Sequence, residues 1–183
     1  MNRKIVFLML LAVGFIALTS CERDDICPEG SMTTPSARLE FYNIENGREE
    51  TIDASSLKFY GMAAGDTLFS SSPSSNHISL PLDFEHKESV FLVEKIKEVK
   101  DPSTGAVIDV INLTDTLTLK YEPVLTFISK ACGYCFTYKN ITMSCTTGHS
   151  ITGYEVLIEG EPSYGELLSS RQVVAKIYID ATE

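Results

Sequence analysis

Apolar side chains alternate with polar ones in short segments along most of the chain. In residues 116–121, for example, Leu117, Leu119 and Tyr121 fall on one side of an extended backbone, and the residues between them fall on the other. A period of two is typical of a half-buried β-strand. Segments rich in Val, Ile, Phe, Tyr and Thr with this character predict strands at residues 38–45, 57–62, 78–83, 89–97, 116–122, 124–131, 154–160 and 173–180.

Turn-forming residues separate these segments. Gly and Asn or Asp occur together at residues 45–47, 63–66 and 101–105, and FSSSPSSN (residues 69–76) has the composition of a polar loop. Residues 90–100 are ambiguous, because their Glu and Lys content would also suit an amphipathic helix. We expect a strand there, since Val and Ile favour extended backbone and DPSTG has the composition of a hairpin turn before AVIDVI.

Many short strands at spacings of roughly eight to twelve residues indicate an all-β protein. The expected fold is an antiparallel β-sandwich, immunoglobulin-like, over residues 37–183. Residues 21–36 are polar and rich in Pro, Gly, Ser and Thr, so they are interpreted as a short tether before the domain.

The N-terminus has the pattern of an export signal. Arg3 and Lys4 precede an uncharged apolar run, Ile5 to Leu18, which is too short for a comfortable membrane span. The run ends in LTSC, and small residues before a cysteine are the signature of a bacterial lipoprotein signal. We therefore predict that residues 1–20 are a signal peptide and that Cys21 becomes the lipidated N-terminus, the alternatives being an ordinary secretory signal or an uncleaved anchor.

The charge balance excludes some partners. With 15 Lys and Arg against 25 Asp and Glu, the formal net charge is −10. Loss of the predicted signal removes Arg3 and Lys4, leaving 13 basic residues against 25 acidic ones, a net charge near −12. An acidic chain without a basic stripe is not expected to bind nucleic acid by neutralising phosphates. The lipid, rather than protein charge, must hold the protein at an anionic membrane.

Four cysteines remain besides Cys21, and an even number in an exported chain indicates disulfides. In an extended backbone, Cys132 and Cys135 face opposite sides of a sheet and need different partners. A hairpin turning at residues 139–141 would place Cys135 opposite Cys145, so we expect that pair together with Cys27–Cys132.

Two other functions for the CGYC sequence stay open. A redox dithiol would need a strand leading into a helix, whereas strand-like residues flank CGYC on both sides. A zinc site could be formed by Cys132, Cys135, Cys145 and His149, although thiolate zinc sites belong mainly to reducing compartments. We expect neither, and therefore no metal and no cofactor.

Catalytic sequence motifs are absent. The sequence contains no HExxH, no GxGxxG and no phosphate-binding loop, and its three histidines, His77, His86 and His149, lie among polar loop residues. The serines of residues 70–75 lack the strand–turn–helix setting of a nucleophile. The protein is therefore not expected to be an enzyme.

Several of these stretches together resemble an uncharacterised lipoprotein family of the Bacteroidetes, a domain of unknown function. They are CERDDIC (residues 21–27), ISKACGY (residues 128–134), RLEFY after the tether and VAKIYID near the end. The resemblance implies an all-β lipoprotein without an assigned activity. It also implies that Cys27 and Cys132 are the cysteines usual in the family and that Cys135 and Cys145 are an additional pair.

Two further features follow from the resemblance. The acidic ERDD directly after Cys21 is similar to the signal that sends such lipoproteins to the cell surface. The DTL sequences at residues 66–68 and 115–117 are similar to an Asp-Thr-aliphatic sequence that these bacteria O-glycosylate, with Thr67 and Thr116 as acceptors.

The expected function is that of a non-catalytic outer-membrane lipoprotein, held by its lipid at the periplasmic face or the cell surface. It would act as a structural or protein-interaction module, with an outer-membrane β-barrel protein as a possible partner. The alternative is a surface lipoprotein that binds a glycan or another ligand, for which exposed aromatic residues such as Tyr42, Tyr60 and Tyr164 could form a platform.

Overall fold

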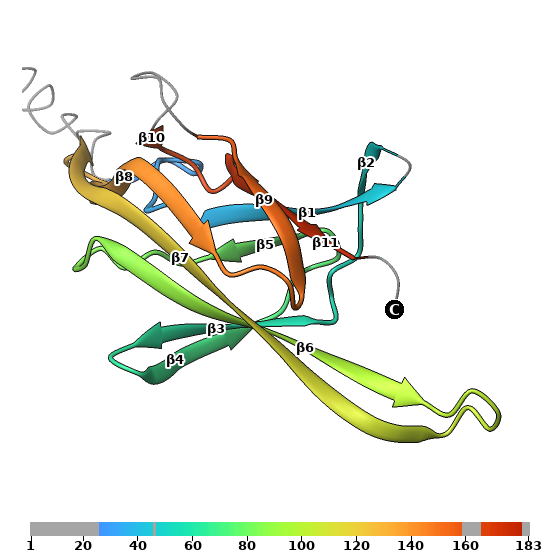
Figure 1. Ribbon diagram of the computed structural model, residues 1–183. Helices are drawn as coiled ribbons and strands as arrows, with labels where there is room; N and C mark the ends of the chain where they lie inside the picture. The colour runs from blue at the N-terminus through green and yellow to red at the C-terminus, as the bar shows by residue number, and fades with distance from the viewer. Residues whose placement is uncertain (1–25, 46, 159–165, 181–183) are drawn as a thin grey trace, which may run out of the picture. The chain divides into compact units, whose positions relative to one another are not determined.

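A computed structural model describes residues 26–45, 47–158 and 166–180, so the predicted signal peptide and Cys21 lie outside the described residues (Figure 1). The described secondary structure consists of strands alone: β1 (Ala37–Glu45), β2 (Arg48–Thr51), β3 (Leu57–Ala63), β4 (Asp66–Ser71), β5 (His77–Leu80), β6 (Glu88–Lys100), β7 (Val107–Ser129), β8 (Gly133–Cys145), β9 (Ile151–Val156), β10 (Glu166–Leu167) and β11 (Val173–Ile179). Within these ranges no helix is long and apolar enough to cross a bilayer.

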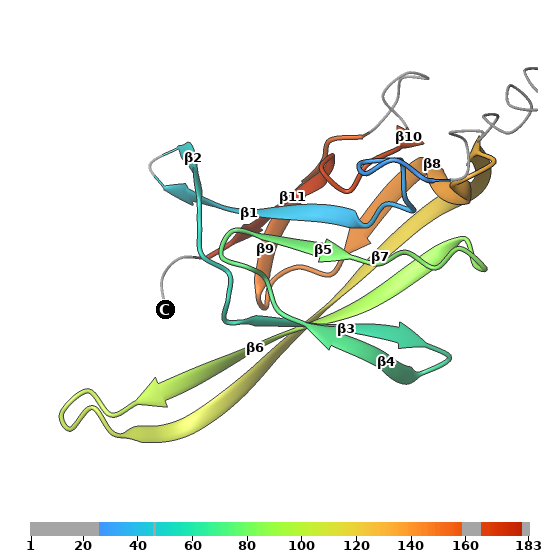
Figure 2. The ribbon, with the colours of Figure 1, turned by 180° about the vertical axis from the view of Figure 1, so that it is seen from behind.

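The strands form two sheets, and the fold is an all-β sandwich, as predicted. One sheet has the order β2-β1-β11-β9, with β5 also paired to β1, and the other has the order β10-β8-β7-β6-β3-β4. Most pairs are antiparallel, but β1 and β11, from opposite ends of the domain, pair in parallel. The views from both sides show β6 and β7 running together well beyond the other strands of their sheet (Figure 1, Figure 2).

Buried apolar side chains follow the alternation in the sequence. Leu117, Leu119 and Tyr121 of β7 are buried, while Thr116 and Thr118 on the other face are half-buried and Lys120 is exposed. The core contains side chains from both sheets, and its largest fully buried members are Phe41, Phe59, Phe91, Leu39, Leu57, Leu80, Leu117, Leu119, Tyr138, Ile151, Leu167 and Ile177. Apolar burial on this scale is what stabilises a two-layer β-domain.

Three predictions about local structure have clear outcomes. The ambiguous residues 90–100 lie in strand β6, which confirms the strand prediction, and residues 101–106 connect it to β7 as a hairpin. The prediction of a loop over residues 69–76 is partly wrong, because Phe69 to Ser71 belong to β4. The two strands predicted at residues 116–122 and 124–131 form one long strand, β7.

Pro123 does not interrupt β7, because the described pairing of β7 with β6 does not extend to it. The pairing of β6 with β7 starts at Glu88 opposite Lys120, and the Tyr121 N–H donates to the carbonyl of Lys87. Pro123 lies beyond this point on the same edge. A proline is tolerated in a strand where the ladder is already open.

The chain divides into two compact units. Among the described residues, the smaller consists of residues 26–31 and 127–134, and the larger contains residues 32–126 and 135–180 apart from residues 46 and 159–165. In the smaller unit a disulfide joins Cys27 to Cys132, with the two Cα atoms 4.8 Å apart, which confirms that prediction. Phe127 and Tyr134 pack there edge to face, with ring centroids 5.2 Å apart.

Candidate functional site

The predicted disulfide between Cys135 and Cys145 is absent, and both cysteines are free. The predicted hairpin turn at residues 139–141 is wrong, because β8 continues through it. Asn140 does have the positive φ of a turn residue, 52°, yet strand pairing extends on both sides of it. Ten residues of extended chain span roughly 30 Å, whereas a disulfide needs Cα atoms within about 7 Å.

The free thiols are not arranged for chemistry. Cys135 is buried, and burial together with the negative charge of Asp115 raises the pKa of the Cys145 thiol to about 12. Because Cys132 is bonded to Cys27, the Cys132-Cys135 dithiol does not form. The same disulfide removes Cys132 from the four candidate zinc ligands. No group of three or more potential metal ligands is found among the described residues.

His149 takes part in a structural cluster centred on Asp115. The Asp115 carboxylate is buried and accepts hydrogen bonds from the backbone N–H groups of Ser150 and Ile151 at 2.6 and 2.9 Å. The His149 ring lies 3.1 Å from the same carboxylate. These bonds hold the segment between β8 and β9, in which the chain passes from one sheet to the other.

The two predicted glycosylation sites differ in access. Thr67 is exposed on β4, the edge strand of its sheet, where its hydroxyl contacts the Met62 sulfur at 3.6 Å. Thr116 is half-buried within β7, and its backbone exchanges hydrogen bonds with Thr146. Thr67 is therefore the more accessible acceptor, and modification at either position stays a prediction.

Of the tyrosines named for an aromatic platform, Tyr42 and Tyr60 bond to carboxylates through their hydroxyl groups. Tyr42 and Tyr60 are half-buried, and their hydroxyl groups donate to Glu40 and Glu94, respectively. Tyr164 lies outside the described residues. A different group of aromatic side chains lines a cavity in the larger unit.

This cavity, about 370 Å³, is the first candidate site, and we call it the pocket. It lies between the β3–β4 hairpin, the segment after β5 and the start of β6. Phe69, Phe84 and Phe91 supply aromatic walls. The remaining lining residues are Gly61, Met62, Leu68, Pro81, Leu82, Asp83, Glu85, Glu88, Ser89 and Val90. A volume of this size with mostly apolar walls is typical of ligand sites.

The β3–β4 wall of the pocket depends on a glycine and a bulge. Gly61 is paired with Phe69 and Met62 with Thr67, which leaves Leu68 as an extra residue in β4. A Cβ atom on Gly61 would lie 2.2 Å from the Phe69 ring, so only glycine lets that ring lie over β3. The Phe69 ring then packs edge to face on Phe91, with centroids 6.1 Å apart. Bulges commonly redirect side chains in this way.

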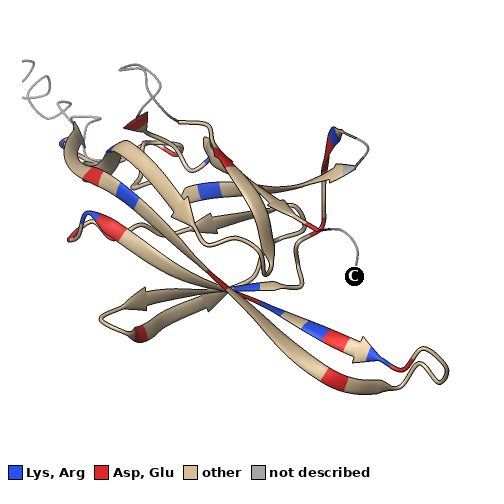
Figure 3. Cartoon of the chain, viewed as in Figure 1, with Lys and Arg blue, Asp and Glu red and all other residues tan. Residues whose placement is uncertain are grey.

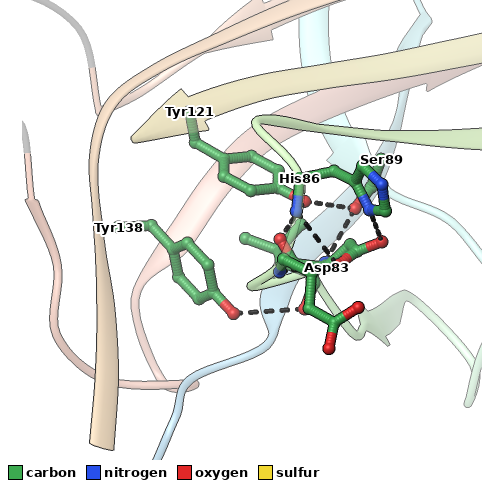
Figure 4. Close-up of polar contacts among 7 residues, drawn as sticks. Asp83, His86, Ser89, Tyr121 and Tyr138 are labelled. Carbon is green, nitrogen blue, oxygen red and sulfur yellow. Dashed lines mark hydrogen bonds and ion pairs between the residues drawn. The ribbon is translucent and has the colours of Figure 1, made fainter. Parts of the chain in front are cut away.

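Two buried tyrosines form hydrogen bonds to the segment after β5, which is another wall of the pocket (Figure 4). Tyr138 of β8 donates to the Leu82 carbonyl at 3.1 Å, and Tyr121 of β7 donates to the Asp83 carbonyl at 2.9 Å. Ser89 accepts from the Asp83 N–H at 3.0 Å and also bonds to the Tyr121 hydroxyl. Burial raises the pKa of Tyr138 to about 12, and it also raises the pKa of Tyr121. Both hydroxyls therefore keep their protons at neutral pH.

Asp83 fixes the turn that follows. Its carboxylate accepts hydrogen bonds from the Glu85 and His86 N–H groups and lies 2.7 Å from the His86 ring. Burial alone would raise the pKa of Asp83, but the bonds from His86 and Glu85 lower it. The hydrogen bond to Asp83 raises the pKa of His86 in turn. The turn presents Phe84 at the pocket rim, where it stacks on Phe136 with centroids 4.8 Å apart.

The second candidate site is the extended part of the β6–β7 hairpin, residues 96–112, which we call the arm. The pairing of β3 with β6 ends at Lys95, and β8 ends at Cys145, next to the Thr146 N–H that donates to the Thr116 carbonyl. Beyond these points β6 and β7 pair with each other alone among the described strands. Figure 1 shows the arm at lower right.

The arm exposes aliphatic side chains on both faces. Residues paired across two strands share a face, so Ile96 and Val110 lie on one face, and Ile111 and Val99 lie on the other. Ile108 is 63% exposed and Val110 is 54% exposed. Most charges of the arm are on β6, whereas β7 contributes Asp109 (Figure 3). An isolated two-stranded ribbon is marginally stable in water, and contiguous exposed aliphatic groups are typical of interaction surfaces.

Both candidate sites lie within the part of the chain that matches a known family. A model of a family of unknown function, DUF6452, matches residues 56–159, more than half of the chain. No curated protein and no solved structure matches the chain significantly, so the immunoglobulin-like character stays a prediction. The chain belongs to the DUF6452 family of unknown function.

Proposed function

We propose that the protein is a non-catalytic lipoprotein of the outer membrane that acts as a structural or protein-interaction module of the cell envelope. The observation that carries the proposal is the arm, a ribbon of two strands whose aliphatic side chains face solvent on both sides. Protein partners stabilise such surfaces by burying apolar area and by pairing with free strand edges.

The two edges of the arm differ in how they would receive a partner. The β6 edge contains Lys97, Glu98 and Lys100, and charged residues of this kind discourage strand addition. The β7 edge, residues 107–112, reads VIDVIN and has one charge, Asp109. The β7 edge is therefore the better surface for an added strand.

The proposed location follows from the sequence LTSC and from the disulfide. With lipid on Cys21, only residues 22–26 separate the anchor from Cys27, which is joined to Cys132. Six extended residue steps reach at most about 20 Å. A domain held this close to a bilayer would meet partners in or on the membrane, and an outer-membrane β-barrel protein is the proposed partner.

Residues that could suggest catalysis have structural partners instead. The His86 ring is hydrogen-bonded to Asp83 and the His149 ring to Asp115. Both aspartates also accept hydrogen bonds from backbone N–H groups. These contacts support a non-catalytic domain. A glycan- or ligand-binding lipoprotein is the second candidate, favoured by the aromatic walls of the pocket.

Polar substitutions on the arm test the proposal. We expect the double variant Ile108→Ser, Val110→Ser to lose its crosslinked partner from envelope fractions while keeping its melting temperature. The matched control is Leu157→Ser with Leu168→Ser, because both leucines are exposed and lie outside the arm. Equal partner recovery with both double variants would reject the arm as the interaction surface.

The tether gives a separate test of location. Inserting a Gly/Ser spacer of about 20 residues between Asp25 and Ile26 should weaken crosslinking to a membrane partner, because effective concentration falls with linker length. Unchanged crosslinking with the spacer would indicate a freely reaching binding module instead.

A further inference from the structure

We infer that the pocket accepts one bulky apolar side chain, preferably aromatic, from a basic segment of a partner protein. The inference rests on the proposed function, because both assign the domain a protein partner. It concerns a different surface from the arm, so the two can fail separately.

The walls determine that the inserted group is apolar. Phe69, Phe84 and Phe91 come from three different segments and surround the cavity with ring faces and edges. Aromatic rings pack favourably with one another in offset or edge-to-face arrangements. A volume of about 370 Å³ has room for one large side chain.

The pocket is built before any ligand arrives. Tyr121 and Tyr138 hold the segment after β5 by its carbonyl groups, and Gly61 lets Phe69 lie against Phe91. A preorganised site loses little conformational entropy on binding, so more of the contact energy remains as affinity.

The charges at the pocket favour a basic neighbour of the inserted side chain. Three carboxylates line the cavity, those of Asp83, Glu85 and Glu88, and the lining includes no Lys or Arg. Asp83 is engaged by His86, and Glu88 lies 4.0 Å from Lys120. Glu85 is exposed. The chain as a whole has a formal net charge of −10, so long-range attraction favours the same cationic partner.

The rim indicates a polypeptide rather than a small amine. Small ligands are mostly enclosed by their sites. Here Leu68 is 66% exposed and Phe84 is 50% exposed, so apolar rim surface would stay uncovered around a small ligand. β4, which supplies Leu68 and Phe69, is the edge strand of its sheet in the described structure. An extended segment could pair with β4 while one of its side chains enters the pocket.

Tryptophan fluorescence gives a direct test because the chain contains no Trp. The probes are acetyl-Lys-Trp-Lys-amide, its Glu-Trp-Glu and Ser-Trp-Ser counterparts, and tryptamine. Each is titrated with the lipidated protein in phosphatidylcholine nanodiscs, and empty nanodiscs serve as the blank. We expect the Lys-Trp-Lys emission to shift to the blue, with the Glu-Trp-Glu peptide binding about tenfold more weakly. Added salt should reduce this difference.

Variants locate the binding. Leu68→Ser and Phe84→Ala should each weaken Lys-Trp-Lys binding, and Leu68→Ser keeps the test valid if Phe84→Ala unfolds, because Leu68 is largely exposed. Glu85→Gln and Glu88→Gln should each reduce affinity about 1.5- to 5-fold. Glu98→Gln is the matched control, because Glu98 lies on the arm.

The outcomes separate the parts of the inference. Binding that is unchanged by Leu68→Ser and Phe84→Ala would overturn the pocket as the site. Equal affinity for the three peptides would overturn the basic segment, and tryptamine binding as tightly as Lys-Trp-Lys would overturn the polypeptide partner. The arm variant Ile108→Ser with Val110→Ser should bind Lys-Trp-Lys as tightly as the wild type, whether or not the arm has a partner. Weaker binding by this variant would overturn the pocket as a site separate from the arm.

Discussion

Gly61 and Phe69 face each other across the β3–β4 pair so closely that a Cβ atom on Gly61 would lie 2.2 Å from Cε1 of Phe69. Two carbon atoms that are not bonded to each other do not approach this closely, so a side chain at position 61 must displace the ring. The Phe69 ring is one wall of the pocket and packs on Phe91. The absence of a side chain at Gly61 therefore determines the shape of the pocket.

Gly61→Ala should lower the free energy of unfolding by about 1–3 kcal/mol, the usual cost of overpacking. It should also weaken Lys-Trp-Lys binding. Gly153→Ala is the matched control, because its Cβ atom would lie 3.6 Å from the Tyr178 ring, an ordinary contact. Denaturant melts of the two variants measure the difference, and equal stabilities would show that the Phe69 ring is not confined.

Tyr138→Phe should destabilise the protein by about 1–3 kcal/mol at neutral pH, because the buried Leu82 carbonyl loses its donor. The same variant should change the alkaline response. Because burial raises the pKa of Tyr138 from 10.0 to about 12, the neutral phenol stabilises the fold below pH 10, and this contribution is lost as the pH rises toward 12.

Urea midpoints measured between about pH 9 and 12 test this sign. The fall in stability over that range should be smaller for Tyr138→Phe than for the wild type. Other groups, including Tyr178 and Cys145, also have pKa values raised to about 12, so some alkaline loss remains in the variant. Identical pH profiles would mean that Tyr138 is not buried against Leu82.

Thiol counting tests whether Cys135 and Cys145 are free thiols. Without reductant, the native protein should react slowly with a thiol reagent at neutral pH, because Cys135 is buried and the Cys145 thiol has its pKa raised to about 12. The denatured protein should then show two free thiols. A digest without reduction should contain the Cys27–Cys132 link, and a Cys135–Cys145 link would restore the original prediction.

Cys21→Ser should release the protein from the envelope if Cys21 carries the lipid, because an unlipidated acidic chain has no affinity for anionic lipid. Fractionation and intact mass measure the change, and the wild type should begin at a modified Cys21. A Cys21→Ser protein that still sediments with the envelope and keeps residues 1–20 would indicate a different anchor.

Much of the fold could be predicted from local sequence. Alternation identified the buried face of β7, and the Gly-containing hairpin at Ala64 and Gly65 has the positive φ values its composition implies. The sequence also predicts the Cys27–Cys132 pair, but it does so from an extended backbone at Cys132, whereas Cys132 lies in the turn between β7 and β8. The alternation and the hairpin turn depend on a few neighbouring residues, which is why a single sequence contains them.

Other features depend on contacts between distant residues. Asn140 has turn-like chemistry, but pairing of β8 with its neighbours overrides it, and the second disulfide prediction failed for that reason. The pocket combines Gly61 with residues near position 84, a pairing with no local signal. An isolated glycine within the strand LKFYGMA was the one available hint of a close approach. The apolar run AVIDVI gave no sign that β6 and β7 continue without further neighbours.

Site-specific photocrosslinking in intact cells tests whether the arm contacts a membrane protein. A photoreactive residue is placed at Ile108 or Val110, with Leu157 as the exposed apolar control outside the arm. We expect one discrete crosslinked membrane protein from Ile108 and Val110 and none from Leu157. Crosslinks from Leu157 alone, or no product from either arm position, would contradict it.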